Sequence, residues 1–223
     1  MRKTLFITGA SSGIGAATAR AAAAAGWNVG LFARSEDKLR SLAEEVGEAA
    51  LVLPGDATDP EAQKQAIETL VSRFGQLDAA FANAGRGTSQ AGTENGDPAD
   101  WKGMVDINVM GALYTAHASL PHLRKTTGTY VVTGSAAGRR HIKGSIYSAT
   151  KWFIHGFAGN LADEMAEWGG RCMVVSPGMV NTEFFDEEKP DKLQPEDVAH
   201  AVMHALEAPK RASIREIHLM PTG

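Results

Sequence analysis

A tyrosine and a lysine four residues apart, Tyr147 and Lys151, have the residue types and the spacing for proton-transfer chemistry. On a helix, residues four apart lie on one face, so the two side chains meet. A tyrosine ordinarily ionises near pH ~10, but an adjacent ammonium favours the phenolate and lowers the pKa. The pair therefore predicts a tyrosine acid/base, although the same spacing also occurs on ordinary helix faces.

Two polar residues elsewhere in the chain could join this pair. Ser135 follows an expected strand over Tyr130–Thr133 and precedes Tyr147 by twelve residues, a loop long enough to bring its hydroxyl beside the phenol. Asn108 lies inside an expected helix, where asparagine is a poor interior residue. We therefore expect its side chain to contact a buried carbonyl or a water.

A glycine-rich stretch over Thr8–Gly15 reads Thr-Gly-Ala-Ser-Ser-Gly-Ile-Gly. It follows an apolar run, Leu5–Ile7, that predicts a strand, and it opens an alanine-rich run, Ala16–Ala25, that predicts a helix closed by Gly26. Glycines let the backbone approach a pyrophosphate, and a helix N-terminus offers free N–H groups. The alternative is a turn that binds nothing, but three glycines between a strand and a helix favour a nucleotide site.

The rest of the chain alternates strands with helices. Such alternation predicts right-handed crossovers, and hence an α/β Rossmann-like fold with a doubly wound, seven-stranded parallel sheet and helices on both faces. Ser35, Asp59 and Asp97 precede expected helices, the last running through Leu113, and Arg86–Gly96 is an expected loop. The other expected strands and helices are Val29–Ala33, Leu51–Leu53, Leu77–Ala82, Tyr147–Trp168, Cys172–Val175, a helix from Pro195, and Ile214–Met220.

Length and composition limit the classes of protein to which the chain can belong. A chain of 223 residues predicts one domain over 1–223, and a formal charge of −4 gives no reason to expect nucleic acid. We find no apolar run of membrane-spanning length and no export signal, so we expect a cytoplasmic protein without a membrane partner. Cys172 is the only cysteine and predicts an inert core thiol. His200 and His204 lack a third ligand, so we expect no metal.

The glycine pattern T-G-x-x-x-G-x-G and the Y-x-x-x-K pattern together resemble the short-chain dehydrogenase/reductase family in its compact single-domain form. Asn108, Ser135, Tyr147 and Lys151 match the family's catalytic tetrad. The resemblance implies hydride transfer between a nicotinamide and a small alcohol or carbonyl substrate. It implies that Tyr147 gives or takes the proton and that Ser135 orients the substrate. It further implies that Lys151 tunes the tyrosine pKa and binds the ribose, and that Asn108 holds a relaying water.

The end of the second strand predicts NADP(H) over NAD(H). Alanine stands where an acid would bind the ribose 2′-hydroxyl, and Arg34 and Ser35 follow it. A guanidinium pairs with a phosphate through two hydrogen bonds, although a solvated arginine and an N-cap serine are the alternatives. Glu36 and Asp37 argue against a phosphate but suit a first helical turn.

The other expected cofactor residues come from the resemblance. It implies that Asp56 accepts from the adenine amino group, that Asn83 joins neighbouring backbones, and that a P-G-x-x-x-T segment ending at Thr182 holds the carboxamide. The full predicted set is Gly9, Ser11, Ser12, Gly13, Ile14, Gly15, Arg34, Ser35, Asp56, Ala57, Asn83, Ala84, Gly85, Tyr147, Lys151, Pro177, Gly178, Val180 and Thr182.

In the family the segment after this threonine forms a lid, which here spans Glu183–Gln194. Phe184 and Phe185 would supply an apolar cover, while the acidic run Asp186–Glu188 would repel an acidic carrier protein. We therefore expect a small or medium free ketone or aldehyde. The basic group over 139–143 could instead favour a carboxylate, so the charge of the substrate stays open.

Two other functions and one assembly state are also predicted. The chain could be a non-catalytic NADP-binding regulatory protein, which would need neither Tyr147 nor Ser135, or an acyl-carrier 3-oxoacyl reductase. The helix from Tyr147 is apolar nearly all round, so packing on the sheet cannot bury every face. By this pattern and by the resemblance we expect a homodimer or homotetramer.

Overall fold

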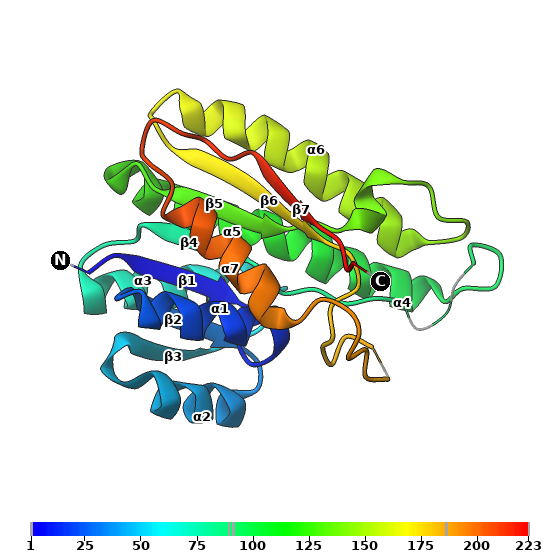
Figure 1. Ribbon diagram of the computed structural model, residues 1–223, viewed down its shortest axis with the longest axis horizontal. Helices are drawn as coiled ribbons and strands as arrows, with labels where there is room; N and C mark the ends of the chain where they lie inside the picture. Colours follow the sequence, from blue (N-terminus) through cyan, green and yellow to red (C-terminus); the bar gives the residue numbers. More distant parts are fainter. Residues whose placement is uncertain (1, 89, 91, 186, 223) are drawn as a thin grey trace.

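The computed structural model describes residues 2–88, 90, 92–185 and 187–222. A seven-stranded sheet forms its centre in the order β3-β2-β1-β4-β5-β6-β7, and each adjacent pair runs parallel (Figure 1). The doubly wound parallel sheet that the sequence predicts is confirmed. The strands are β1 (Thr4–Thr8), β2 (Asn28–Ala33), β3 (Ala50–Pro54), β4 (Ala79–Ala82), β5 (Thr129–Thr133), β6 (Arg171–Pro177) and β7 (Glu216–Leu219).

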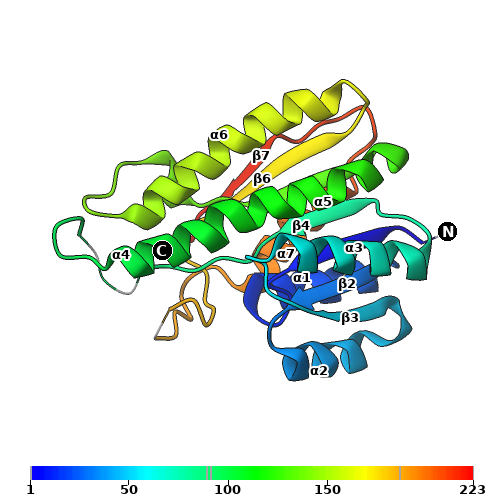
Figure 2. The same ribbon diagram turned by 180° about the vertical axis from the view of Figure 1, so that it is seen from behind.

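Helices cover both faces of the sheet, and a separate hydrophobic core lies beneath each layer (Figures 1 and 2). Alanines at 16, 19 and 22 bury the inner side of α1, and their small size lets this helix pack closely on α7. The first layer holds α1 (Gly13–Ala24), α2 (Glu36–Val46) and α7 (Pro195–Leu206); the second holds α3 (Pro60–Phe74), α5 (Gly111–Thr126) and α6 (Ile146–Ala166).

The long helix expected after Asp97 contains an irregularity. Asp97 caps it by accepting from the Ala99 backbone N–H. It continues as α4 (Pro98–Val105), a π-helical segment over Asp106–Met110, and α5, which ends at Thr126. The long helix that the sequence predicts through Leu113 is present and continues to Thr126, whereas the π segment, which widens the helix by one residue, was not predicted.

Several other boundaries differ from the sequence-based prediction. α1 begins at Gly13 and not at Ala16, so the last residues of the glycine stretch already belong to the helix. β6 is longer than Cys172–Val175 because it pairs with both β5 and β7, whereas β7 is shorter than Ile214–Met220. Of the predicted loop and lid residues, Ser89, Ala91 and Asp186 lie outside the described residues.

The single cysteine is part of the core. Cys172 is buried in β6, and burial raises the pKa of its thiol to about 12. The prediction of an inert core thiol is confirmed. Within the part of the chain that the structure describes, no helix has the length and apolar character needed to cross a bilayer.

Candidate active site

The glycine stretch makes a tight turn between β1 and α1 at the carboxyl edge of the sheet. Gly9 and Gly13 have φ values of 65° and 51°, in the left-handed region that favours glycine. A Cβ atom at Gly15 would lie 2.2 Å from the Gly9 carbonyl oxygen, so no side chain fits there. Ser12 precedes α1, and its side chain makes no capping hydrogen bond. The first N–H groups of α1 are thus available to an anion such as a pyrophosphate.

Hydrogen bonds tie the ends of β1, β4 and β5 together behind this turn. The Thr8 hydroxyl oxygen accepts from the backbone N–H groups of Asn83 and Ala84, at 3.0 and 3.1 Å. The Asn83 amide donates to the Thr8 and Gly9 carbonyls, at 3.2 and 3.3 Å, and accepts from the Thr133 hydroxyl at 3.2 Å. Asn83 therefore joins neighbouring backbones and holds the turn in register with the sheet.

Asn108 makes a second clamp from inside the π segment. Its amide oxygen accepts from the Arg86 N–H at 2.9 Å, and its amide nitrogen donates to the Arg86 carbonyl at 2.9 Å and to the Thr150 hydroxyl at 3.1 Å. A Cβ at Gly85 would lie 3.0 Å from the amide oxygen, which requires a small residue there. The buried carbonyl contact that the sequence indicated is thus present, and it links the loop after β4 to α6.

The first turn of α6 brings Tyr147 and Lys151 to the same edge. Ser145 caps this helix by accepting from the Ser148 N–H at 3.0 Å. The Lys151 Nζ lies 5.7 Å from the Tyr147 ring centroid and donates to the Thr133 carbonyl at 2.8 Å.

Ser135 comes to the same place from the end of β5. Its side chain lowers the pKa of the Tyr147 phenol, which places the two hydroxyl groups near each other, and it accepts from the Ala137 N–H at 3.0 Å. Tyr147, Lys151 and Ser135 therefore lie together, and a substrate oxygen could approach the two hydroxyl groups.

The pKa of Tyr147 differs from the sequence-based expectation. Burial raises the pKa of the Tyr147 phenol, and the hydrogen bond from Ser135 only partly offsets it. Burial also lowers the pKa of Lys151 to about 8. The lowering that the sequence predicts combines this ammonium with a cationic nicotinamide; in the free protein burial is the larger influence on the phenol, and the ammonium donates to the Thr133 carbonyl. At neutral pH the free protein consequently holds a protonated phenol, which is the form that can donate a proton.

Arg34 and Ser35 follow β2 at the same edge and are both exposed. Ser35 stands at the N-cap position of α2, but its side chain makes no capping hydrogen bond, so the sequence-based expectation of a capping serine was wrong. Among the described residues, no ion pair engages Arg34. The guanidinium and the hydroxyl can therefore both turn to a phosphate.

Asp56 and Ala57 follow β3. One carboxylate oxygen of Asp56 accepts from the N–H and the hydroxyl of Thr58, each at 2.9 Å, which is an ordinary turn arrangement. Ala57 is buried, and its carbonyl accepts from the Gln63 amide at 2.7 Å. These hydrogen bonds fix the segment that follows β3. The second carboxylate oxygen of Asp56 can accept from another donor.

The segment after β6 reaches back to the glycine turn. Pro177 ends the strand, and the Gly178 N–H donates to the Leu219 carbonyl at 2.8 Å. Val180 is buried and pairs with Leu193. The Thr182 methyl would lie 3.0 Å from a Cβ at Gly13, so this threonine packs directly on the turn.

Phe184 covers the tyrosine from the next part of this segment. Its ring centroid is 5.6 Å from that of Tyr147, and its edge would lie 3.1 Å from a Cβ at Gly87. The neighbouring Glu183 forms an exposed ion pair with Lys38 of α2 at 2.9 Å. We call residues 182–194 the cover segment; it closes over the phenol with an exposed aromatic ring.

The predicted basic group is not gathered at the tyrosine. Arg139 forms an ion pair with Glu216 of β7, and the His141 ring stacks on that of Trp152 on the outer side of α6. His200 and His204 are exposed on α7. A search of the described residues finds no group of three or more His, Cys, Asp or Glu side chains that could hold a metal ion.

Sequence reasoning missed three threonines that position this site. Thr8 holds Asn83, Thr133 holds Lys151 and Asn83, and Thr150 holds Asn108. Thr8 and Thr133 both end parallel strands, which is the one available signal, because ligand sites in open α/β sheets form at the carboxyl ends of strands.

Most of the chain matches a known protein family. The family model described as short chain dehydrogenase matches residues 3–193. An uncharacterised oxidoreductase of Staphylococcus aureus (strain USA300) is 36% identical over 225 residues, which cover 98% of this chain and 97% of the relative.

Two solved structures are also similar. The alcohol dehydrogenase from the archaeon Thermococcus sibiricus complexed with 5-hydroxy-NADP has a TM-score of 0.92 and 31% identity, covering 100% of this chain and 97% of the other. Serine dehydrogenase from Escherichia coli has a TM-score of 0.89 and 26% identity, covering 98% and 97%.

Proposed function

The chain belongs to the short-chain dehydrogenase family of oxidoreductases, and on that premise we propose that it is an NADP(H)-dependent enzyme that interconverts a small carbonyl compound and its alcohol. The observation that carries the proposal is the meeting of Tyr147, Ser135 and Lys151 beside an open glycine turn. A protein that only bound the nucleotide would need the turn but not Tyr147 with Ser135 beside it.

In this proposal the cofactor supplies or accepts the hydride when it is bound, and the protein handles the proton. In reduction, the Tyr147 phenol donates its proton to the substrate oxygen, while the Ser135 hydroxyl hydrogen-bonds to that oxygen and orients it. The Lys151 ammonium stabilises the phenolate that forms and binds the ribose. Both amide hydrogens of Asn108 are used by Arg86 and Thr150, so a relaying water would have to donate to an oxygen of Asn108.

The cofactor fits the residues that are present. The glycine turn and the uncapped start of α1 would hold the pyrophosphate. Asp56 and Ala57 would contact the adenine, Asn83, Ala84 and Gly85 the ribose, and Gly178, Val180 and Thr182 the carboxamide. Arg34 and Ser35 would hold a 2′-phosphate, and support for NADP(H) comes from their unengaged side chains and from the 5-hydroxy-NADP complex of the archaeal relative.

A titration tests the cofactor preference. Arg34→Ala should weaken NADPH binding about tenfold or more and leave NADH binding within twofold, because only the phosphate loses a charged partner. Fluorescence titration of both cofactors measures this. Arg40→Ala, on the adjacent α2 helix and in an exposed ion pair with Glu36, is the matched control. Equal affinity of the native protein for NADPH and NADH would refute the assignment.

The substrate class follows from the cover segment. Phe184 places an aromatic face over the phenol, and Glu183, Glu187 and Glu188 make this segment acidic. We therefore propose a small or medium free ketone or aldehyde, since an acidic carrier protein would be repelled. We also propose a cytoplasmic enzyme.

A panel of carbonyl compounds tests the function itself. NADPH oxidation would be followed with aromatic aldehydes, diketones, 3-oxo acids and acyl-carrier thioesters, with Tyr147→Phe as the control for background. We expect free carbonyls to turn over and the variant to lose nearly all activity while still binding NADPH. Turnover of carrier thioesters alone would favour the acyl-carrier reductase, and no turnover of any member would favour the regulatory protein.

Assembly is part of the proposal. Trp152 and Phe153 on α6 are 45% and 44% exposed, and Val105 of the neighbouring α4 is 38% exposed. Such side chains on adjacent helices suit a symmetric interface, so we propose a homodimer through these helices or a homotetramer. Light scattering at micromolar concentration measures the mass, and a monomer would contradict this.

A further inference from the structure

One partly buried ionisable side chain touches the active site without belonging to the predicted tetrad. His155 lies on α6 one turn after Lys151, and its side chain is 14% exposed. Its Nε2 atom is 3.3 Å from the Ser135 carbonyl oxygen and 3.3 Å from the Ser176 hydroxyl. The same carbonyl also accepts from the Gly138 N–H at 2.9 Å. A side chain of α6 therefore contacts the backbone carbonyl of Ser135.

The turn around Ser135 is shaped to admit this ring. A Cβ at Gly134 would lie 3.1 Å from the His155 Nε2, and a Cβ at Gly138 would lie 2.7 Å from its Cδ2. Glycine at these two positions leaves space for the imidazole and also for Val174, Ser176 and the Lys151 carbonyl, which crowd the same turn. A turn with two glycines loses much conformational freedom when it becomes ordered, so a fixed contact helps to stabilise its folded conformation.

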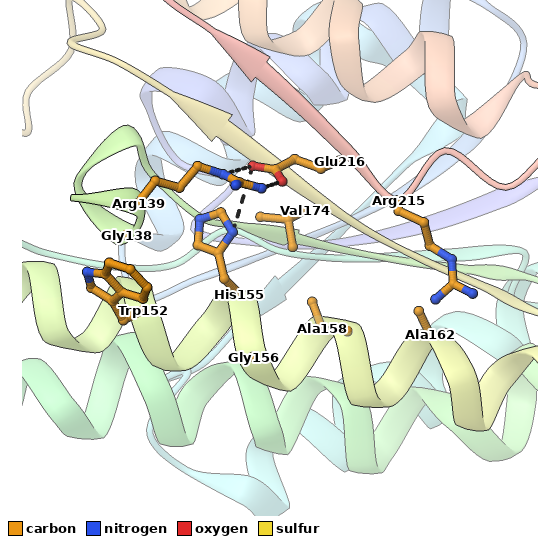
Figure 3. Close-up of a pocket in the computed structure, with 11 residues that line it drawn as sticks. Gly138, Arg139, Trp152, His155, Gly156, Ala158, Ala162, Val174, Arg215 and Glu216 are labelled. Carbon is orange, nitrogen blue, oxygen red and sulfur yellow. Dashed lines mark hydrogen bonds and ion pairs between the residues drawn. The ribbon is translucent and has the colours of Figure 1, made fainter.

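The electrostatic surroundings favour one tautomer of the ring. Burial lowers the pKa of His155 and outweighs the Ser135 hydrogen bond, which raises it, while the nearby charges of Arg139, Lys151 and His218 lower it further, so the ring is neutral at neutral pH. A carbonyl oxygen can only accept, so the contact with Ser135 is a hydrogen bond when the ring hydrogen is on Nε2, and the Ser176 hydroxyl oxygen then faces the same N–H. The other nitrogen, Nδ1, faces the Glu216 carboxylate at 3.7 Å, beyond hydrogen-bonding distance, and that carboxylate is paired with Arg139 (Figure 3).

We propose that His155 is a positioning residue, which fixes the Ser135 turn through Nε2–H so that the serine hydroxyl meets the phenol and the substrate oxygen. The inference rests on the proposed function, because it acts through the orienting role of Ser135. Catalytic hydroxyls must be held close to the productive geometry, and small displacements are costly in rate. Loss of this contact should therefore lower kcat and leave the affinity for the cofactor unchanged.

Three substitutions at His155 distinguish the roles of its two ring nitrogens. His155→Gln can place an amide N–H where Nε2 stands, His155→Asn places one where Nδ1 stands, and His155→Leu places none. With the carbonyl that the native protein reduces best, we expect kcat to fall about tenfold in the leucine and asparagine variants and to stay within about threefold in the glutamine variant. The Kd for NADPH should stay within twofold in all three. Asn160→Ala, exposed on the same helix, is the matched control.

The outcomes distinguish this inference from the proposed function. If the native chain reduces no carbonyl, or Ser135→Ala is as active as the native chain, the proposed function fails and this inference fails with it. If the native chain is active and His155→Leu keeps its kcat, or the glutamine variant loses as much as the asparagine variant, only the role of His155 is overturned. Should the leucine variant unfold, the glutamine and asparagine variants decide the matter by themselves.

Discussion

The clamps behind the glycine turn and the cover segment above it are built from different interactions. Asn83 and Asn108 each join separate elements through three or more hydrogen bonds. The cover segment is anchored at its ends by Thr182 on the glycine turn and by hydrogen bonds between Asn181 and the Lys189 and Leu193 backbone. Over the phenol, however, its contact with the site is the Phe184 ring, and it reaches α2 through the exposed Glu183–Lys38 ion pair. Buried hydrogen bonds are strong because the local dielectric is low, whereas exposed ion pairs contribute little.

The difference indicates that the two regions have separate roles. Under the proposed function, the clamps hold the groups that would move the proton, so damage to them should lower kcat and stability together. The cover segment would then enclose the substrate, so changes there should alter KM alone. Variants in each region can test whether this division holds.

The largest effect should come from Asn108→Leu, which keeps the volume of the side chain but removes every hydrogen bond. It leaves the Arg86 N–H and carbonyl and the Thr150 hydroxyl without this partner, at a cost of about 2–4 kcal/mol. We expect a lower Tm and a kcat reduced about 100-fold. Calorimetry and steady-state kinetics measure both, with Asn160→Ala as the control; a native Tm would show that this clamp does not support the site.

A smaller effect should come from pH. Because the pKa of Lys151 is lowered to about 8, its ammonium is present below that pH and is lost above it. The kcat/KM for carbonyl reduction should therefore be constant below pH 8 and fall about tenfold per unit above it. Phe184→Ala should show the same profile, since the cover segment takes no part in this ionisation. A profile that rose through pH 8 would exclude the ammonium as the required form.

The smallest effect should come from Phe184→Ala. Removing the ring opens the space over Tyr147, so KM for an apolar carbonyl should rise about threefold to tenfold through lost contact area, with kcat unchanged. The Tm should stay within about 1 °C because the ring is largely exposed. Phe184→Leu should restore part of the affinity. A loss of kcat equal to that of Asn108→Leu would erase the distinction between the two regions.

Much of the fold and the site follows from local sequence patterns. Apolar runs between turn residues predict the sheet, and the turn over Thr8–Gly15 and the Tyr147–Lys151 spacing locate the site residues. What could not be predicted depends on distant partners. The π segment arises where Asn108 must reach Arg86, and the unused Ser35 hydroxyl and the raised Tyr147 pKa follow from surroundings that spacing does not encode.

The buried cysteine makes the molecule convenient for spectroscopy. Because the pKa of the Cys172 thiol is about 12, it stays protonated and unreactive toward maleimides at neutral pH. A second cysteine introduced at an exposed position of the cover segment, such as Glu187, would then be the one site that takes a fluorophore. Tyr147 could remain native in such a labelled protein, so opening and closing above the phenol could be followed in real time during turnover.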